Sequence, residues 1–194
     1  MTPAHATPSH AGSDMRAGLV TAALAVLQRD GAAKLTVRKI TEEAGCSTTG
    51  VYTWFGGKNG LVEAIFIDGF ESFDRALDPH LEADDLLGAG RAYRRFALGN
   101  RMQYLVMFGR AVPDYEPSEA ALGRSVVSFA KLADAVARFF RAAGVEDDSA
   151  AAAYHLFATV HGYVMLELAG MGPDVEADAD ALYERALAEL GRTA

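Results

Sequence analysis

The chain has 194 residues, 51% of them hydrophobic and 9% aromatic, with a formal net charge of −8 and a single cysteine. This apolar content excludes a disordered chain, and because no apolar run reaches about 18 residues, it also excludes a membrane-spanning one. One thiol cannot form an internal disulfide, and the N-terminus shows no apolar segment behind a basic start. We therefore expect a soluble cytoplasmic protein without a membrane partner.

The charge is unevenly distributed along the chain. The first 60 residues hold six Lys and Arg against four acids, a net charge of +2, whereas the remaining 134 residues carry −10. Phosphate contacts require Lys and Arg, so a mildly basic head on an acidic body fits a small DNA-contacting module joined to a non-binding domain. Chance variation would give the same difference, so charge alone decides nothing.

The N-terminal residues predict a tail and then a helix. Residues 1–13 mix Pro, Ser, Thr, His and Gly without periodicity and are expected to be a disordered tail. Apolar residues recur at helical spacing over residues 14–30, which predicts an amphipathic helix that Gly31 ends.

Two short helices follow. Thr36 is suited to cap a helix over residues 37–44, and Ser47 to cap a second one that runs to about residue 54. Gly45 suits the tight turn between them, so the pair is typical of a helix-turn-helix. We expect a DNA-binding domain over residues 14–60.

The rest of the chain, residues 61–194, predicts a helical ligand-binding and dimerisation domain. No sustained alternation requires a strand, so the fold class is all-α with about nine helices. The six helices expected beyond the head cover residues 59–80, 84–99, 101–109, 117–143, 147–170 and 175–191.

The last two helices predict a homodimer. The helix near 147–170 is apolar on nearly all sides and must be covered on more than one face. The final helix carries a clean apolar stripe, so a four-helix seam between two subunits is expected, with a buried helix of a monomer as the alternative. The stripe consists of Ala179, Leu182, Tyr183, Ala186, Leu187 and Leu190.

The second short helix would carry the DNA contacts. In a helix-turn-helix its first residues approach base edges, here Thr48, Thr49 and Gly50. Tyr52 and Thr53 can bind phosphate oxygens. Val51 and Phe55, four residues apart, would anchor this helix to the rest of the head. Lys58, at the start of the next helix, is suited to bind a phosphate.

The span from residue 15 to residue 65 resembles the DNA-binding head of the tetracycline-repressor (TetR) family of transcriptional regulators. The matching positions are Gly31, Thr36, Arg38, Ile40, Ala44, Gly45, Ser47, Tyr52, Phe55, Lys58 and Leu61. Residues 159–170, "TVHGYVMLELAG", are also similar to the C-terminal domain of a subgroup with a His-Gly element.

The resemblance implies a non-enzymatic dimer that binds palindromic operator DNA and releases it when a small molecule enters the C-terminal domain. The chain departs from the family at Thr41, Cys46, Gly57 and Gly60, and the two glycines are expected to loosen the start of the fourth helix. The expected DNA-facing set is Thr36, Arg38, Ser47, Thr48, Thr49, Gly50, Tyr52, Thr53 and Lys58.

Large apolar groups in the second domain favour a mainly apolar or aromatic effector, although each of them could simply fill the core. His161, Tyr93 and Tyr104 are the candidates for its polar contacts. The expected ligand-binding residues are Phe70, Tyr93, Phe96, Met102, Tyr104, Met107, Phe108, Phe129, Phe157 and His161, with Phe73 beside them.

Other kinds of site have weaker support. Cys46 could sense redox state but is more simply a small buried hydrophobe. His155 and His161 lie on different sides of one helix, so we expect core or interface histidines, no metal and no cofactor. No catalytic constellation is present. The rival function is a helical small-molecule-binding protein or enzyme without DNA affinity.

Overall fold

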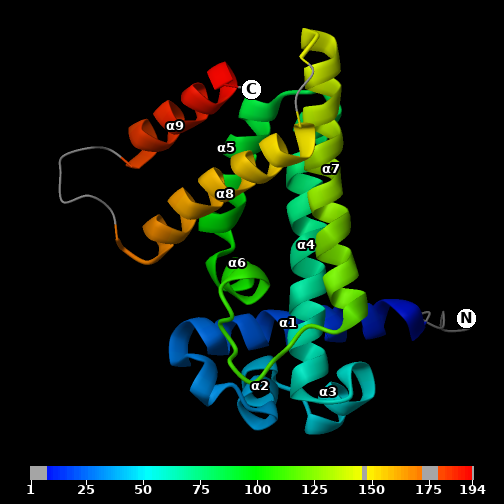
Figure 1. Cartoon of the computed structure of the whole chain (residues 1–194). Helices are drawn as coiled ribbons and strands as arrows, with labels where there is room; N and C mark the ends of the chain where they lie inside the picture. The colour runs from blue at the N-terminus through cyan, green and yellow to red at the C-terminus, as the bar shows by residue number, and fades with distance from the viewer. Residues whose placement is uncertain (1–7, 146–147, 172–178, 194) are drawn as a thin grey trace, which may run out of the picture.

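The computed structural model describes residues 8–145, 148–171 and 179–193, and within them it contains helices and no strand (Figure 1). The all-α prediction is confirmed. The elements are α1 (Pro8–Asp30), the 3-10 helix η1 (Ala32–Lys34), α2 (Val37–Ala44), α3 (Thr48–Phe55), α4 (Lys58–Glu82), α5 (Leu86–Gly99), α6 (Arg101–Phe108), α7 (Glu119–Ala143), α8 (Ser149–Leu168) and α9 (Ala179–Thr193).

Helices α1 to α3 and the start of α4 form a head at one end of the molecule (Figure 1). As predicted, the Thr36 side chain caps α2 by accepting a hydrogen bond from the Lys39 amide, and Gly45 ends it with φ at +65°. That left-handed conformation favours glycine and makes the tight turn into α3. The side chains of the head core are fully buried and include Leu19, Val26, Ile40, Val51 and Leu61.

The second part of the fold is built around α4, which rises from the head with α7 beside it (Figure 1). Helices α5, α6 and α8 pack against this pair, and α9 covers α5 and α8. Helix α6 also contacts α1, so the second part touches the head directly as well as through α4.

Two predicted boundaries are wrong. Helix α1 begins at Pro8 and not at Asp14, because proline fits the first turn of a helix, where its missing N–H is not needed; residues 1–7 lie outside the described residues. Helix α4 passes through Pro79 and ends at Glu82. There, one turn from the helix end, proline removes a single backbone bond and the packed helix tolerates it.

The division predicted at residues 60 and 61 falls inside α4, which is continuous. Leu61 and Ile65 belong to the head core, whereas Phe70 and Phe73 on the same helix pack against aromatic rings of α5 and α6. The head and the second part are therefore joined by a rigid element and share one hydrophobic core.

Candidate DNA-binding surface and ligand cavity

Helix α3 presents a row of polar side chains to solvent. Its apolar side carries Val51, which is fully buried in the head core. The helix is thereby anchored on one side and free to contact DNA with the other. The exposed hydroxyl-bearing residues of this row are Thr48, Thr49, Tyr52 and Thr53, with Tyr52 60% exposed.

Two more of the predicted DNA-facing residues lie at the start of α2 and are exposed. Thr36 is exposed, and the Arg38 side chain is 86% exposed. The Arg38 Nε donates to Glu42 Oε1 over 2.8 Å. Both side chains of this pair are exposed and screened by solvent, so the guanidinium can exchange Glu42 for a phosphate at little cost.

The turn between α3 and α4 places Lys58 at the first position of α4, half-buried, beside the free amides of the helix start. Gly60, in the first turn of α4, has a steric role. A Cβ at Gly60 would lie 1.8 Å from the carbonyl oxygen of Phe55. The expectation that Gly60 merely loosens α4 is therefore incomplete, because the close approach of α3 requires a glycine there.

Two residues of the helix-turn-helix differ from expectation in detail. Ser47 occupies the N-cap position of α3, but its side chain makes no capping hydrogen bond. A Cβ at Gly50 would point at Met15 and Leu19 of α1, so Gly50 faces the head interior. Trp54, on the same helix, is 45% exposed.

Arg16 of α1 ties the head to α4. Its guanidinium donates two hydrogen bonds to the Asp68 carboxylate, at 2.9 and 3.1 Å. The same group lies 5.6 Å from the centre of the Phe55 ring at the end of α3. One side chain thus connects the first helix, the recognition helix and the long helix that enters the second part.

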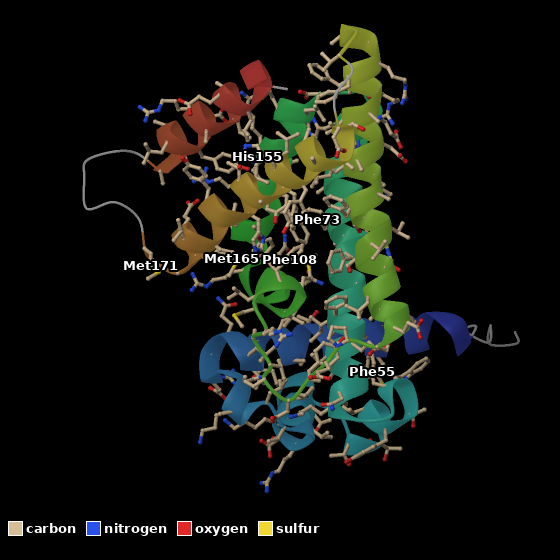
Figure 2. The ribbon with its side chains drawn as sticks, in the orientation of Figure 1. Phe55, Phe73, Phe108, His155, Met165 and Met171 are labelled. Carbon is tan, nitrogen blue, oxygen red and sulfur yellow. The ribbon has the colours of Figure 1, made fainter. Side chains whose placement is uncertain are left out.

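A cavity of about 650 Å³ lies among α4, α5, α7 and α8. Its wall is mainly apolar, and Figure 2 shows Phe73 and Phe108 pointing toward one another beside α8. The ring centres of these two residues are 6.3 Å apart. A space of this size suits a small-molecule ligand.

The structure divides the predicted ligand-binding residues into two groups. Phe70, Tyr93, Phe108, Phe129 and Phe157 line the cavity, as does Phe73. Outside the lining, Phe96 packs on Phe73, and a Cβ at Gly69 would lie 2.6 Å from the Met107 sulfur. The residues that do not line the cavity are Phe96, Met102, Tyr104, Met107 and His161.

The three predicted polar contacts form one cluster. The Tyr93 and Tyr104 hydroxyl oxygens are 2.8 Å apart, and His161 Nδ1 lies 3.0 and 2.8 Å from them. Burial raises the pKa of Tyr104 to about 12 and that of Tyr93 well above its ordinary value, and it lowers the pKa of His161. The neutral cluster links α5, α6 and α8, and only Tyr93 reaches the cavity wall.

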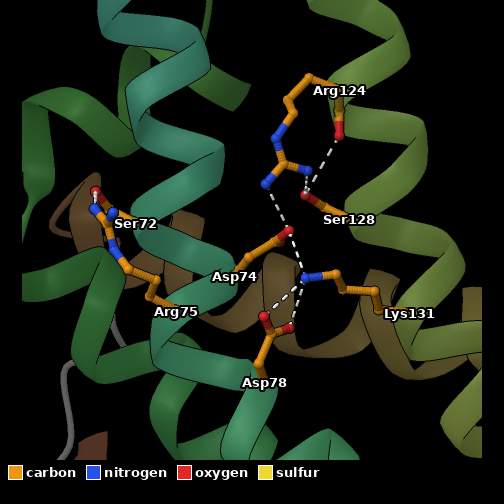
Figure 3. Close-up of polar contacts among 7 residues, drawn as sticks. All are labelled: Ser72, Asp74, Arg75, Asp78, Arg124, Ser128 and Lys131. Carbon is orange, nitrogen blue, oxygen red and sulfur yellow. Dashed lines mark hydrogen bonds and ion pairs between the residues drawn. The ribbon is translucent and has the colours of Figure 1, made fainter.

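Sequence patterns did not reveal a charged network between α4 and α7 (Figure 3). The Asp74 Oδ2 atom accepts from Arg124 at 2.7 Å and lies 2.9 Å from the Lys131 ammonium, which also contacts Asp78. Burial opposes ionisation of Asp74, but hydrogen bonds from Ser128, Arg124 and Lys131 outweigh it and hold the pKa of Asp74 below its ordinary value. Asp74 is one of several acids on α4, and its partner Arg124 lies 50 residues away, so no local pattern indicated this pair.

Much of the stripe of α9 is used within the chain. Tyr183 and Leu187 are buried against α5, and the Tyr183 hydroxyl donates to the Gly90 carbonyl at 2.7 Å. The buried residues of the stripe therefore cannot form the predicted subunit seam, whereas the dimer itself stays a prediction. On α8, by contrast, Leu166 is 52% exposed and Tyr163 is also exposed.

The remaining candidates show no chemistry of their own. Cys46 is half-buried and packs on the head core. His155 is exposed on α8 (Figure 2), so it is not a core histidine. Among the described residues, no cluster of His, Cys, Asp and Glu could hold a metal ion. In the same part of the chain, no helix is long and apolar enough to cross a membrane.

Comparison with known proteins agrees with this geometry. The chain is 27% identical over 115 residues to the HTH-type transcriptional regulator Rv1816 of Mycobacterium tuberculosis, which covers 55% of this chain and 49% of that protein. The chain thus spans about half the length of the curated relatives it matches.

Solved structures share the fold over nearly the whole chain. The regulatory protein SCO4313 superposes with a TM-score of 0.81 at 24% identity, covering 95% of this chain and 98% of that one. FadR from Bacillus subtilis, solved in complex with stearoyl-CoA, gives a TM-score of 0.71 at 16% identity, covering 90% and 96%.

Two family models match the chain in sequence. The model for bacterial regulatory proteins of the tetR family matches residues 19–65, and that for the tetracyclin repressor-like C-terminal domain matches residues 86–190, more than half of the chain. The protein therefore belongs to the TetR family of DNA-binding, non-enzymatic transcriptional regulators.

Proposed function

We propose that the protein is a ligand-responsive repressor that binds a palindromic operator as a dimer and releases it when a small, mainly apolar molecule enters the cavity. The observation that carries this proposal is that α4 joins the two parts. It holds the head core at one end and forms a cavity wall at the other. Residues 14–60 would bind DNA, and residues 61–194 would bind ligand and form the dimer.

The exposed surface of α2 and α3 supports the DNA contact. Thr48 and Thr49 at the start of α3 would read base edges, and Tyr52 and Thr53 would bind phosphates. Arg38 and Lys58 would supply the positive charge for phosphate contacts, whereas the second part of the chain is acidic overall. Thr36 and Ser47, both exposed, would add hydroxyl contacts to the backbone.

The outward faces of the last two helices support the dimer, in place of the stripe of α9 that the chain itself covers. Along α8 the exposed face combines the small residues Ala158 and Gly162 with Leu166. A Cβ at Gly162 would meet nothing within 4 Å, so no contact among the described residues requires a glycine there. Two α8 helices could pack closely at this position. We also propose that the protein belongs to the subgroup with a His-Gly element, which His161 and Gly162 would form.

The apolar wall of the cavity supports the class of effector. Each ring that a ligand covers adds apolar area removed from water. FadR, which has this fold, is solved in complex with stearoyl-CoA, a molecule with a long apolar chain. To cause release, the effector must bind the non-DNA conformation more tightly, because equal affinity for both conformations shifts nothing.

A mobility-shift and footprinting experiment on the DNA that flanks the protein's own gene tests the proposal. We expect protection of two symmetric half-sites about one helical turn apart, or a multiple of that distance. Apolar compounds should raise the melting temperature and release the DNA. Gly162→Arg should abolish both the dimer, measured by light scattering, and the shift.

Gly99→Arg is the matched control, because Gly99 is also helical and a Cβ there would meet nothing within 4 Å. Protection of a single asymmetric half-site, or release only by strongly anionic compounds, would contradict the proposal. Ligand binding without any DNA shift would favour the rival function, a helical small-molecule-binding protein.

A further inference from the structure

The shape of the cavity favours an elongated ligand. Phe70 and Leu81 both line it, and they are 11 residues apart on α4. At 1.5 Å per residue this separation is about 17 Å along the helix axis. Ser125 and Phe139 on the neighbouring α7 also line the cavity and are similarly far apart. A volume of about 650 Å³ spread over this length describes a channel and not a sphere.

The charged groups of the lining all have one sign. They are the carboxylates of Asp74, Asp84 and Asp85, and no Lys or Arg is among the lining residues of the described chain. The bases that pair with two of these acids, Arg124 with Asp74 and Arg138 with Asp84, do not line the cavity. An anionic group in the channel would therefore meet carboxylates and no cation.

Asp74 is the acid placed in the middle of the channel. It is only 4% exposed and shares the lining with the rings of Phe70 and Phe73. Both of its ion pairs, with Arg124 and Lys131, use Oδ2 (Figure 3). Neither of these cations contacts Oδ1. Ser128 also donates a hydrogen bond to this carboxylate, but its two oxygens together offer about four acceptor sites, so Asp74 can still accept a hydrogen bond from a group inside the cavity. An ionised carboxylate has only acceptor atoms.

We propose that the effector is an elongated apolar molecule with a neutral hydrogen-bond donor, such as a hydroxyl or an amide N–H, which it gives to Asp74, and that the cavity rejects carboxylates. This inference rests on the proposed function, because it names the chemistry of the ligand that the same cavity takes. A neutral donor leaves the pairs of Asp74 with Arg124 and Lys131 intact. A carboxylate would be buried beside a like charge without a partner, which is costly.

The proposed preference for a neutral ligand distinguishes this cavity from one that binds an anionic acyl derivative. The chain shares its fold with FadR, which is solved with stearoyl-CoA, at only 16% identity. At that level the fold is common, whereas the lining residues are not fixed by it. The acidic lining described above predicts a different preference at the polar end of the ligand.

The test uses the full chain and three ligands built on a ten-carbon chain: decanol, decyl methyl ether and decanoate. Each competes with N-phenyl-1-naphthylamine, a neutral apolar probe whose fluorescence rises in an apolar site. Decanol should displace the probe at a concentration about tenfold or more below that needed for the ether, which lacks the donor. Decanoate should be weaker still. Equal displacement by decanol and decanoate would overturn the proposal.

Two variants assign the preference to Asp74. Asp74→Asn should remove most of the discrimination against decanoate, because the amide supplies a donor and no charge. Asp78→Asn is the matched control, since Asp78 also pairs with Lys131 but does not line the cavity. It should keep the order of the three ligands. The same change of order in both variants would refute the role of Asp74.

Displacement needs no DNA, so it is independent of repression. Release of labelled operator is measured separately by fluorescence anisotropy. If the predicted ligand order holds but no ligand releases the operator, the proposed function fails and the cavity chemistry stands. If the ligands release the operator but decanoate is as effective as decanol, the cavity chemistry fails alone. The order in the unmodified protein decides the question even if Asp74→Asn does not fold.

Discussion

Replacing Gly60 by alanine sets two opposing effects against each other. Alanine has the higher helix propensity, by about 1 kcal/mol in a helix interior, so local preference predicts a stabilised α4. The structure predicts the reverse. The new Cβ would lie 1.8 Å from the Phe55 carbonyl oxygen and 2.9 Å from its carbon. A comfortable carbon–oxygen contact is about 3.3 Å or longer, so the turn between α3 and α4 must open by roughly 1.5 Å.

A backbone carbonyl cannot swing aside as a flexible side chain does. Overpacking of this kind costs about 1 to 3 kcal/mol, and the propensity gain offsets only part of it. We expect Gly60→Ala to lose about 1 to 2 kcal/mol of unfolding free energy and several degrees of melting temperature, at about 2 to 4 °C per kcal/mol for a chain of this size.

Thermal and urea unfolding of both proteins measure the difference. Gly123→Ala is the matched control, because Gly123 is helical and a Cβ there would meet nothing within 4 Å. This control should gain roughly 0.5 to 1 kcal/mol. If Gly60→Ala melts at or above the unmodified protein, the close approach of α3 and α4 does not constrain residue 60 and the reasoning is refuted.

Three further predictions concern the head, the polar cluster and the cavity. Tyr52→Phe should weaken binding to all operator variants about equally, whereas Thr49→Ala should also change the base preference; an unchanged preference at constant salt would remove Thr49 from the base contacts. Because burial lowers the pKa of His161 from 6.5, the unfolded chain takes up a proton first as pH falls. The free energy of unfolding should therefore decline as pH falls from 6.5 through the lower pKa that His161 has in the folded protein. His161→Gln should reduce this decline, measured by urea unfolding at a series of pH values. An identical decline in the variant would show that His161 is not its cause. Phe157→Trp should reduce the cavity volume that is open to a ligand and so weaken operator release by apolar compounds. DNA binding without ligand should be unchanged in a shift assay. Weakened DNA binding in that assay would contradict the assignment of Phe157 to the cavity.

Local sequence patterns were sufficient for the elements and for the exposed face of the head. Thr36 and Gly45 carry their signals within a few residues, since a cap and a left-handed turn depend on nearby backbone groups. Val51, flanked by polar residues, marked the buried side of α3 for the same reason. The large aromatic residues also indicated a pocket-capable domain, and several of them line the cavity.

Features that depend on distant partners could not be predicted in this way. The stripe of α9 is apolar whether its own chain or a second subunit covers it, and only the packing of Tyr183 against Gly90 decides between them. Asp74 and Arg124 are 50 residues apart, so nothing local pairs them. The need for a glycine at position 60 arises from a contact with Phe55 that helix propensity does not describe.

The continuity of α4 also constrains how regulators of this kind can be recombined. Each residue turns a helix by about 100° and advances it by 1.5 Å, so one residue inserted between Ile65 and Phe70 would rotate the cavity wall by about 100° relative to the recognition helix. An insertion of seven residues would restore the angle to within about 20° but would separate the two parts by roughly 10 Å. Chimaeras that take this head or this cavity from another regulator must therefore be joined at matched positions of α4, with no residue gained or lost.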